Sequence, residues 1–141
     1  MKSLLLPLML LPTPALVEVC EVQMLNRRAN GPMVYKPAYL NIAPGDTVRF
    51  LPTQPGHNAA AIEGVIPEGT APFKSKINAR FEVTLTEIGA YGIKCSPYYA
   101  MGMVMLIEVG EKADVSLPEV LPKRATERFE QILTGRDQPK E

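Results

Sequence analysis

Three side chains with metal-binding chemistry stand out in this sequence of 141 residues. Met103 follows Cys95 by eight positions, and His57, the only histidine, lies far upstream on a separate segment. A thiolate, a thioether and an imidazole form a set of soft and intermediate ligands that suits copper cycling between Cu(I) and Cu(II). Blue-copper sites hold the metal with two histidines, one cysteine and a weakly bound methionine. The residues therefore predict a copper site that lacks one of its imidazoles.

Short strands are expected to position these side chains. Residues 20–24 alternate between apolar and polar, as do residues 81–85, and this is the period of a half-buried strand. Cys95 ends one predicted strand and Met103 lies at the start of the next. A short loop between two paired strands keeps its ligands around one point with little reorganisation. Further strands are predicted at 39–42, 47–51, 91–95 and 104–109.

The rest of the sequence favours one all-β domain. Apolar residues make up 46% of the chain, and 14 prolines and 10 glycines interrupt it, which suits many short strands joined by turns. Near the C-terminus, Ala125, Phe129 and Ile132 recur at helical spacing, and Gly135 is expected to end that helix. A shorter helix is expected at 117–121. The predicted fold is a Greek-key β-sandwich with C-terminal helices from about residue 113.

The first 17 residues predict a secretory signal peptide. Lys2 supplies a positive start, residues 4–11 are almost continuously apolar, and residues 12–15 form a small-residue exit. The apolar run is shorter than the ~20 residues that a membrane span needs, and its prolines disfavour a buried helix. Cleavage after Ala15 and cleavage after Val17 both fit. We therefore expect residues 18–141 to form a single exported domain.

The composition excludes several function classes. The 15 basic and 15 acidic residues balance, so no basic field points to nucleic acid and no acidic excess points to disorder. The sequence shows no paired carboxylates, no nucleophile beside a base and no phosphate-binding loop, and we expect no enzymatic activity. A monomer outside the membrane is expected.

The two cysteines leave one question open. In a compartment that permits disulfides, Cys20 and Cys95 can pair if their Cα atoms lie within about 7 Å. Cys20, however, falls on the apolar face of a predicted strand and suits a small core position. Cys95 lies in a loop suited to ligation, and its oxidation would destroy the copper site. A disulfide is therefore the weaker of the two predictions.

Several motifs together resemble the pseudoazurin family of cupredoxins over essentially the whole chain. The resemblance is carried by a first strand, a pair of strands around a Pro-Gly turn, an isolated Gly-His-Asn, a middle loop and a methionine-rich loop. In this sequence they are Met24-Leu25-Asn26, residues 39–50, Gly56-His57-Asn58, residues 66–69 and 73–78, and Ala100-Met101-Gly102-Met103. The resemblance implies a copper-bearing sandwich with two C-terminal helices.

By this resemblance, His57, Cys95 and Met103 are copper ligands, and Met101 is left to packing. Four further residues match positions that support such a site. Asn58 and Ser96 match positions that tie the two ligand loops together by hydrogen bonds. Pro97 has no N–H, which limits the hydrogen bonds reaching the thiolate sulfur and so affects the potential. Met33 matches a position that packs against the second histidine.

The departure from the family pattern is Tyr98. The family has its second histidine three residues after the cysteine, and this sequence has tyrosine there. A phenol with a pKa of about 10 is mostly neutral at pH 7, and its oxygen is a harder ligand than the imidazole that copper prefers. In the family that histidine is the partly exposed edge through which electrons pass. Tyr98 is thus a doubtful fourth ligand, or an aromatic side chain filling the space.

The resemblance implies a periplasmic electron carrier that donates to a reductase such as a copper-containing nitrite reductase. The prediction for this chain is such a carrier with an altered copper site. In the family, lysines around the copper face steer docking to an acidic partner, and Lys36, Lys74, Lys76, Arg80 and Lys94 are candidates here. The alternative is a redox-inactive periplasmic protein that binds copper or no metal and keeps only the scaffold.

Overall fold

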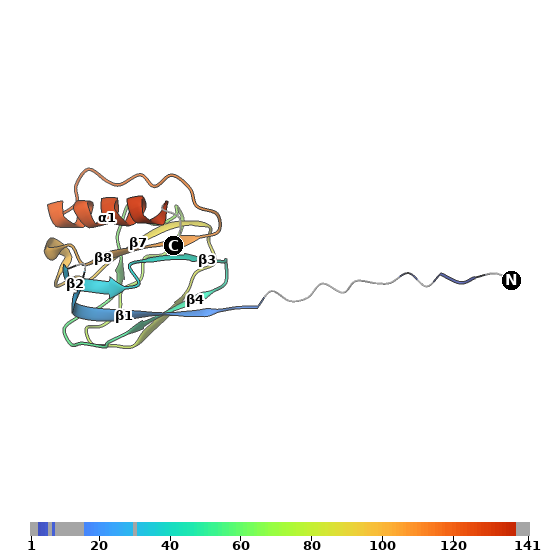
Figure 1. The fold of residues 1–141 in the computed structure, drawn as a ribbon, viewed down its shortest axis with the longest axis horizontal. Helices are drawn as coiled ribbons and strands as arrows, with labels where there is room; N and C mark the ends of the chain where they lie inside the picture. The colour runs from blue at the N-terminus through green and yellow to red at the C-terminus, as the bar shows by residue number, and fades with distance from the viewer. Residues whose placement is uncertain (1–2, 6, 8–15, 30, 138–141) are drawn as a thin grey trace.

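Two four-stranded sheets face each other in the computed structural model, which describes residues 3–5, 7, 16–29 and 31–137 (Figure 1). One sheet has the strand order β2-β1-β4-β6 and the other β3-β8-β7-β5. Each contains one parallel pair, β1 with β4 and β3 with β8. The elements are β1 (Val19–Arg28), β2 (Gly31–Lys36), β3 (Tyr39–Ile42), β4 (Thr47–Leu51), β5 (Ala60–Ala61), β6 (Phe81–Thr84), β7 (Gly89–Lys94), the 3₁₀ turn η1 (Tyr99–Met101), β8 (Val104–Val109) and α1 (Lys123–Arg136). This sandwich confirms the predicted fold class.

The main hydrophobic core lies between the two sheets. The alternation in β1 buries Val22 and Met24, and the same period in β4 buries Val48 and Phe50. All six residues of β8 are buried, because one face meets the opposite sheet and the other is covered by the C-terminal segment. A strand buried on both faces is expected to be continuously apolar, which matches Val104 to Ile107.

A second hydrophobic core lies outside the sheet that contains β7 and β8, where α1 covers that sheet (Figure 1). Ala125, Phe129 and Ile132 form the buried stripe of the helix and pack against Val104 and Leu106. The predicted apolar periodicity of this helix is therefore confirmed. Its packing fixes the C-terminal segment onto the strand that follows the 95–103 loop.

The expected shorter helix at 117–121 is wrong, and only one helix follows β8 among the described residues. Pro118 and Pro122 lack an N–H, and each also restricts the residue before it, so the three residues between them cannot form a stable helical turn. Leu117 and Leu121 still pack against the second core. The helical extension therefore begins at Lys123, not near residue 113.

Two other boundaries differ from expectation. Gly135 lies inside α1, which continues to Arg136, whose guanidinium hydrogen-bonds to the buried carboxylate of Glu108. Residues 26–32 are polar and include a glycine, which predicts a loop, but β1 extends to Arg28 and β2 begins at Gly31. Antiparallel pairing of β1 with β2 continues almost to the turn, where Arg28 is opposite Gly31, so the hydrogen-bond ladder overrides the polar composition.

The predicted signal peptide falls mostly on residues outside the described ranges. Within those ranges no helix is long and apolar enough to cross a membrane. Both cysteines are free thiols: Cys20 is half-buried in β1 and Cys95 is buried in the core. The alternative of a Cys20–Cys95 disulfide is therefore not what the structure shows.

Candidate metal centre

His57 lies in the loop after β4, and its ring is held from one side. The side chain is completely buried, and its Nε2 lies 2.6 Å from the Oδ1 of Asn26 at the end of β1. Because an amide oxygen can only accept, Nε2 carries the proton and Nδ1 has a free lone pair. That Nδ1 lies 3.7 Å from the Sγ of Cys95. The imidazole thus presents its ligating nitrogen to the thiol.

Burial sets the protonation of both groups. It lowers the pKa of His57, so the imidazole stays neutral and able to ligate. Burial also raises the pKa of the Cys95 thiol, an effect partly offset by backbone hydrogen bonds from Asn58 and Tyr98. Without metal, Cys95 is therefore a protonated thiol, and metal binding releases its proton.

Met103 and Cys95 lie at the two ends of one tight loop. The amide of Cys95 donates to the carbonyl of Met103 at 3.0 Å, and both side chains are completely buried in the main core. Inside the loop, the amides of Met101 and Met103 both donate to the carbonyl of Tyr98 at 3.1 Å. These bonds close the 95–103 loop without contribution from its side chains.

Gly102 is required at the end of η1. It has φ +88°, and a Cβ there would lie 2.7 Å from the carbonyl oxygen of Arg124 in α1. A side chain would therefore be strained and would also push the loop away from the helix. The helix and the 95–103 loop consequently support each other.

Asn58 joins the histidine loop to the cysteine loop. Its Oδ1 accepts from the amide of Ser96 at 2.7 Å, and its Nδ2 lies 3.3 Å from both the Oγ of Ser96 and the carbonyl of Ser75. Its own carbonyl accepts from the hydroxyl of Tyr35 at 2.6 Å. Asn58 is almost completely buried, so these bonds hold the loops bearing His57 and Cys95 at a fixed separation.

Tyr98 is half-buried beside His57. The centroids of the two rings lie 5.2 Å apart with an interplanar angle of 57°. Pro97 is exposed on the same loop, and Met33, at φ +53°, is packed against the main core. The structure thus brings His57, Cys95, Met103 and Tyr98 to one end of the sandwich.

Asn26 is a contributor that the sequence analysis missed. It was noted only as the end of a strand motif, whereas its side chain contacts Nε2 of His57. A ligating histidine needs an acceptor for its second nitrogen. This requirement predicts that some hydrogen-bond acceptor lies beside Nε2 of His57, but it does not predict which residue. The parallel pairing of β1 with β4 brings Asn26 to that position.

The donor set fits copper better than a hard cation. Among the described residues no group of three His, Cys, Asp or Glu side chains could hold a metal. The cluster therefore depends on the thioether of Met103 as its third donor. One neutral imidazole, one thiol and one thioether, all without solvent exposure, suit copper and not magnesium or calcium.

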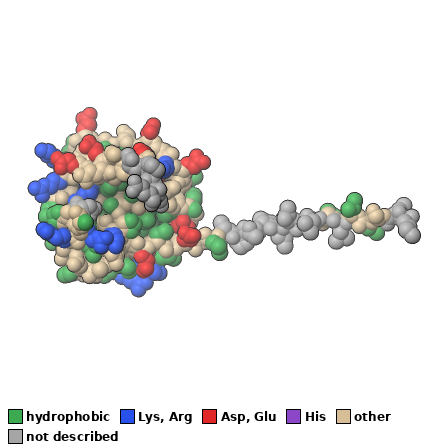
Figure 2. Space-filling model, viewed as in Figure 1, with side chains coloured by type: hydrophobic (Ala, Val, Ile, Leu, Met, Phe, Trp, Pro, Cys, Tyr) green, Lys and Arg blue, Asp and Glu red, His purple; other side chains and the backbone are tan. Residues whose placement is uncertain are grey.

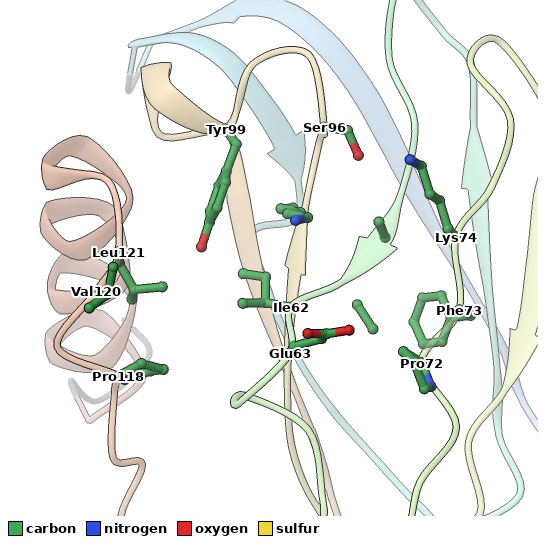
Figure 3. A pocket seen from close by; sticks show the side chains of 13 residues that line it. Ile62, Glu63, Pro72, Phe73, Lys74, Ser96, Tyr99, Pro118, Val120 and Leu121 are labelled. Atoms are coloured by element: carbon green, nitrogen blue, oxygen red, sulfur yellow. The ribbon is translucent and has the colours of Figure 1, made fainter.

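A cleft of about 430 Å³ lies next to this end, between residues 118–121 and strand β5 (Figure 3). Tyr99 and Ser96 line it from the 95–103 loop, and Lys74 lies on the opposite wall. Lys94 also lines it, with its ammonium 5.0 Å from the centroid of the Tyr99 ring. Lys and Arg side chains gather toward the end of the molecule that carries η1 (Figure 2). Positive charge is therefore concentrated near the candidate centre.

A two-sheet sandwich with a histidine, a cysteine and a methionine brought together on loops at one end defines the cupredoxin class. The family model of copper binding proteins of the plastocyanin/azurin family matches residues 22–110. Pseudoazurin of Paracoccus pantotrophus is 44% identical over 129 residues, which covers 89% of each chain. The chain belongs to this copper-binding family and, within it, to the pseudoazurins.

Solved structures agree with this assignment. Pseudoazurin from Methylobacterium extorquens AM1 superposes with a TM-score of 0.78 at 36% identity, covering 85% of this chain and 99% of the other. Native pseudoazurin from Hyphomicrobium denitrificans gives 0.72 at 31% identity, with coverage of 85% and 99%. The protein is thus a copper-binding electron carrier of the pseudoazurin type and not an enzyme, and it interacts with redox partners.

Proposed function

We propose that this chain is a periplasmic electron carrier whose copper site is altered by Tyr98, and that it donates to a reductase such as a copper-containing nitrite reductase. The observation that carries the proposal is the 3.7 Å separation between Nδ1 of His57 and Sγ of Cys95, with Nε2 engaged by Asn26. This is a pair of donors prepared for one metal ion.

When bound, copper supplies the one-electron couple between Cu(I) and Cu(II). His57, Cys95 and Met103 are the proposed ligands. Asn26 holds the imidazole in one tautomer, and Asn58 keeps the two ligand loops together. Because these supports are built into the strands and loops, the donors need little movement between oxidation states.

The proposed docking surface is the end of the molecule around the 95–103 loop. Lys74 and Lys94 line the cleft beside Ser96, and Pro97 is exposed there. These cations would raise the rate of encounter with an acidic partner and would lose that effect as salt screens them. Export through a signal peptide over residues 1–17 is part of the same proposal.

The experiment is a copper titration of the reduced protein beside a Tyr98→His variant, followed by visible absorption. We expect the parent to lack an intense blue colour and Tyr98→His to acquire one, because the variant restores the second imidazole. A parent with ordinary intense blue colour would show that Tyr98 does not alter the site. If neither protein binds copper, the chain keeps only the scaffold and the alternative of a redox-inactive binding protein replaces the proposal.

A further inference from the structure

We propose that Tyr98 closes the metal centre without ligating the metal, so that His57, Cys95 and Met103 form a three-donor site selective for Cu(I) over Cu(II). This inference rests on the copper-binding function proposed above and adds the oxidation state that the site prefers. It is carried by the position of the Tyr98 side chain.

The hydroxyl end of Tyr98 lies against the backbone of the histidine loop. A Cβ added to Gly56 would be 3.3 Å from Oη of Tyr98 and 3.8 Å from its Cε2. An imidazole carries Nδ1 next to the ring carbon that joins Cβ, whereas a phenol carries its oxygen at the opposite end of the ring. Tyrosine at this position therefore extends its oxygen past the point where a histidine would place its donor.

The ring of Tyr98 takes the place of the missing ligand. It lies 5.2 Å from the ring of His57, and it packs against the core cluster that contains Cys95 and Met103. The ring carbons offer no lone pair to a metal, yet they keep a half-buried apolar surface over the donors. The centre is thus covered but left with one nitrogen and two sulfur donors.

This donor set favours the lower oxidation state for two reasons. Thiolate and thioether are soft ligands that select Cu(I), and the imidazole that best supports Cu(II) is present only once. A thiolate with Cu(I) is also neutral overall, whereas a thiolate with Cu(II) carries one positive charge. His57, Cys95 and Met103 are all completely buried, and an apolar environment penalises the charged state.

The test measures the affinities for Cu(I) and Cu(II) separately, in a Cys20→Ser background that leaves Cys95 as the only thiol. Anaerobic Cu(I) is titrated against a chromogenic Cu(I) chelator, and Cu(II) against a Cu(II) chelator. Thermal unfolding and the rate of Cys95 alkylation report binding without any electron-transfer assay. The variants are Tyr98→Phe, which removes only the oxygen, and Tyr98→His.

We expect Cu(I) to stabilise the parent against unfolding and to protect Cys95 from alkylation. We expect Cu(II) to bind the parent at least about 100-fold more weakly than it binds the Tyr98→His variant. Tyr98→Phe is expected to match the parent in both affinities, because the phenol oxygen is not a ligand. Cu(II) binding by the parent with an absorption band that Tyr98→Phe loses would overturn the inference and leave the copper function standing. Binding of both ions by Tyr98→His but of neither by the parent would overturn the inference and also the proposed electron-carrier function of this chain. Failure of all three proteins to bind either ion would remove the proposed function as well.

Discussion

At the scale of single residues, the metal centre depends on side chains that act through the ligands. Asn26 fixes the tautomer of His57, and Asn58 bonds to Ser96 across the two loops. Asn26 acts through its amide oxygen, whereas Asn58 uses both its amide oxygen and its amide nitrogen. The orientation of the donors is therefore established before a metal arrives.

Asn26→Ala is expected to lower copper affinity by about 10–100-fold, since partners that orient a metal-bound histidine typically contribute this much. Without the acceptor, Nε2 of a buried imidazole loses its hydrogen bond and the ring can adopt the other tautomer. Competitive Cu(I) titration of the reduced protein measures the effect.

Asn41→Ala is the matched control for this substitution. Its amide donates to the carbonyls of Glu108 and Gly110 at the opposite end of the sheet. Equal loss of copper affinity in both variants would mean that Asn26 acts through general stability and not through His57.

At the scale of elements, α1 and the 95–103 loop are packed as one unit. Phe129 and Ala125 of the helix pack with Val104 of β8, while the backbone of Arg124 approaches Gly102. The helix was predicted from its apolar spacing, but its contact with the loop was not. The contact depends on a left-handed glycine whose neighbour is far away in the sequence.

Gly102→Ala is expected to destabilise the fold by about 2–4 kcal/mol, which combines backbone strain at φ +88° with a clash of 2.7 Å against the carbonyl of Arg124. Gly45→Ala separates the two effects, because Gly45 has φ +95° and nothing within 4 Å of its Cβ. Its expected cost is about 1–2 kcal/mol. Urea unfolding of the copper-free proteins gives both values, and equal costs would show that the loop and α1 are not tightly packed.

At the scale of the whole molecule, a buried polar cluster joins the C-terminus of α1 to the sheet. The carboxylate of Glu108 in β8 is hydrogen-bonded by the guanidinium of Arg136, by the hydroxyl of Tyr39 at 3.1 Å and by the amide of Ala113 at 3.1 Å. The side chain of Glu108 is only 2% exposed, so it depends on these partners. Burial and the bond to Glu108 raise the pKa of Tyr39 to about 12.

This pKa predicts how stability changes at alkaline pH. Unfolded tyrosine loses its proton at about pH 10, so between pH 10 and 12 the folded state holds a proton that the unfolded state has lost. The contribution of Tyr39 to stability is therefore complete below pH 10 and is lost as pH rises through about 12.

Tyr39→Phe tests this linkage. The parent is expected to be more stable by about 1–2 kcal/mol at pH 8, for one hydrogen bond to a carboxylate on a partly exposed side chain. The difference should shrink as pH rises from 10 to 12, measured by urea unfolding. A difference that stays constant over this interval would mean that burial and the bond to Glu108 do not raise the pKa of Tyr39.

Much of the molecule was predictable because the information is local. Alternation in β1 and β4, the spacing of the helix stripe, and the joint occurrence of His57, Cys95 and Met103 can all be recognised within short segments or from residue types. The same holds for the departure at Tyr98, which is a matter of residue identity. Around residue 118 the sequence contains opposing features. The apolar spacing of Leu117 and Leu121 favours a helix, whereas Pro118 and Pro122 disfavour one, and the apolar pattern alone predicted a helix that does not form.

What the sequence determined by itself was thus the class of fold, the kind of donors and the missing imidazole. Only the tertiary structure decided which residues surround those donors. Asn26 reaches His57 because β1 lies beside β4, and the hydroxyl of Tyr98 lies against Gly56 because the two loops meet at one end of the sandwich. Such contacts join positions far apart in the chain, and their geometry depends on strand pairing and core packing that no local pattern contains.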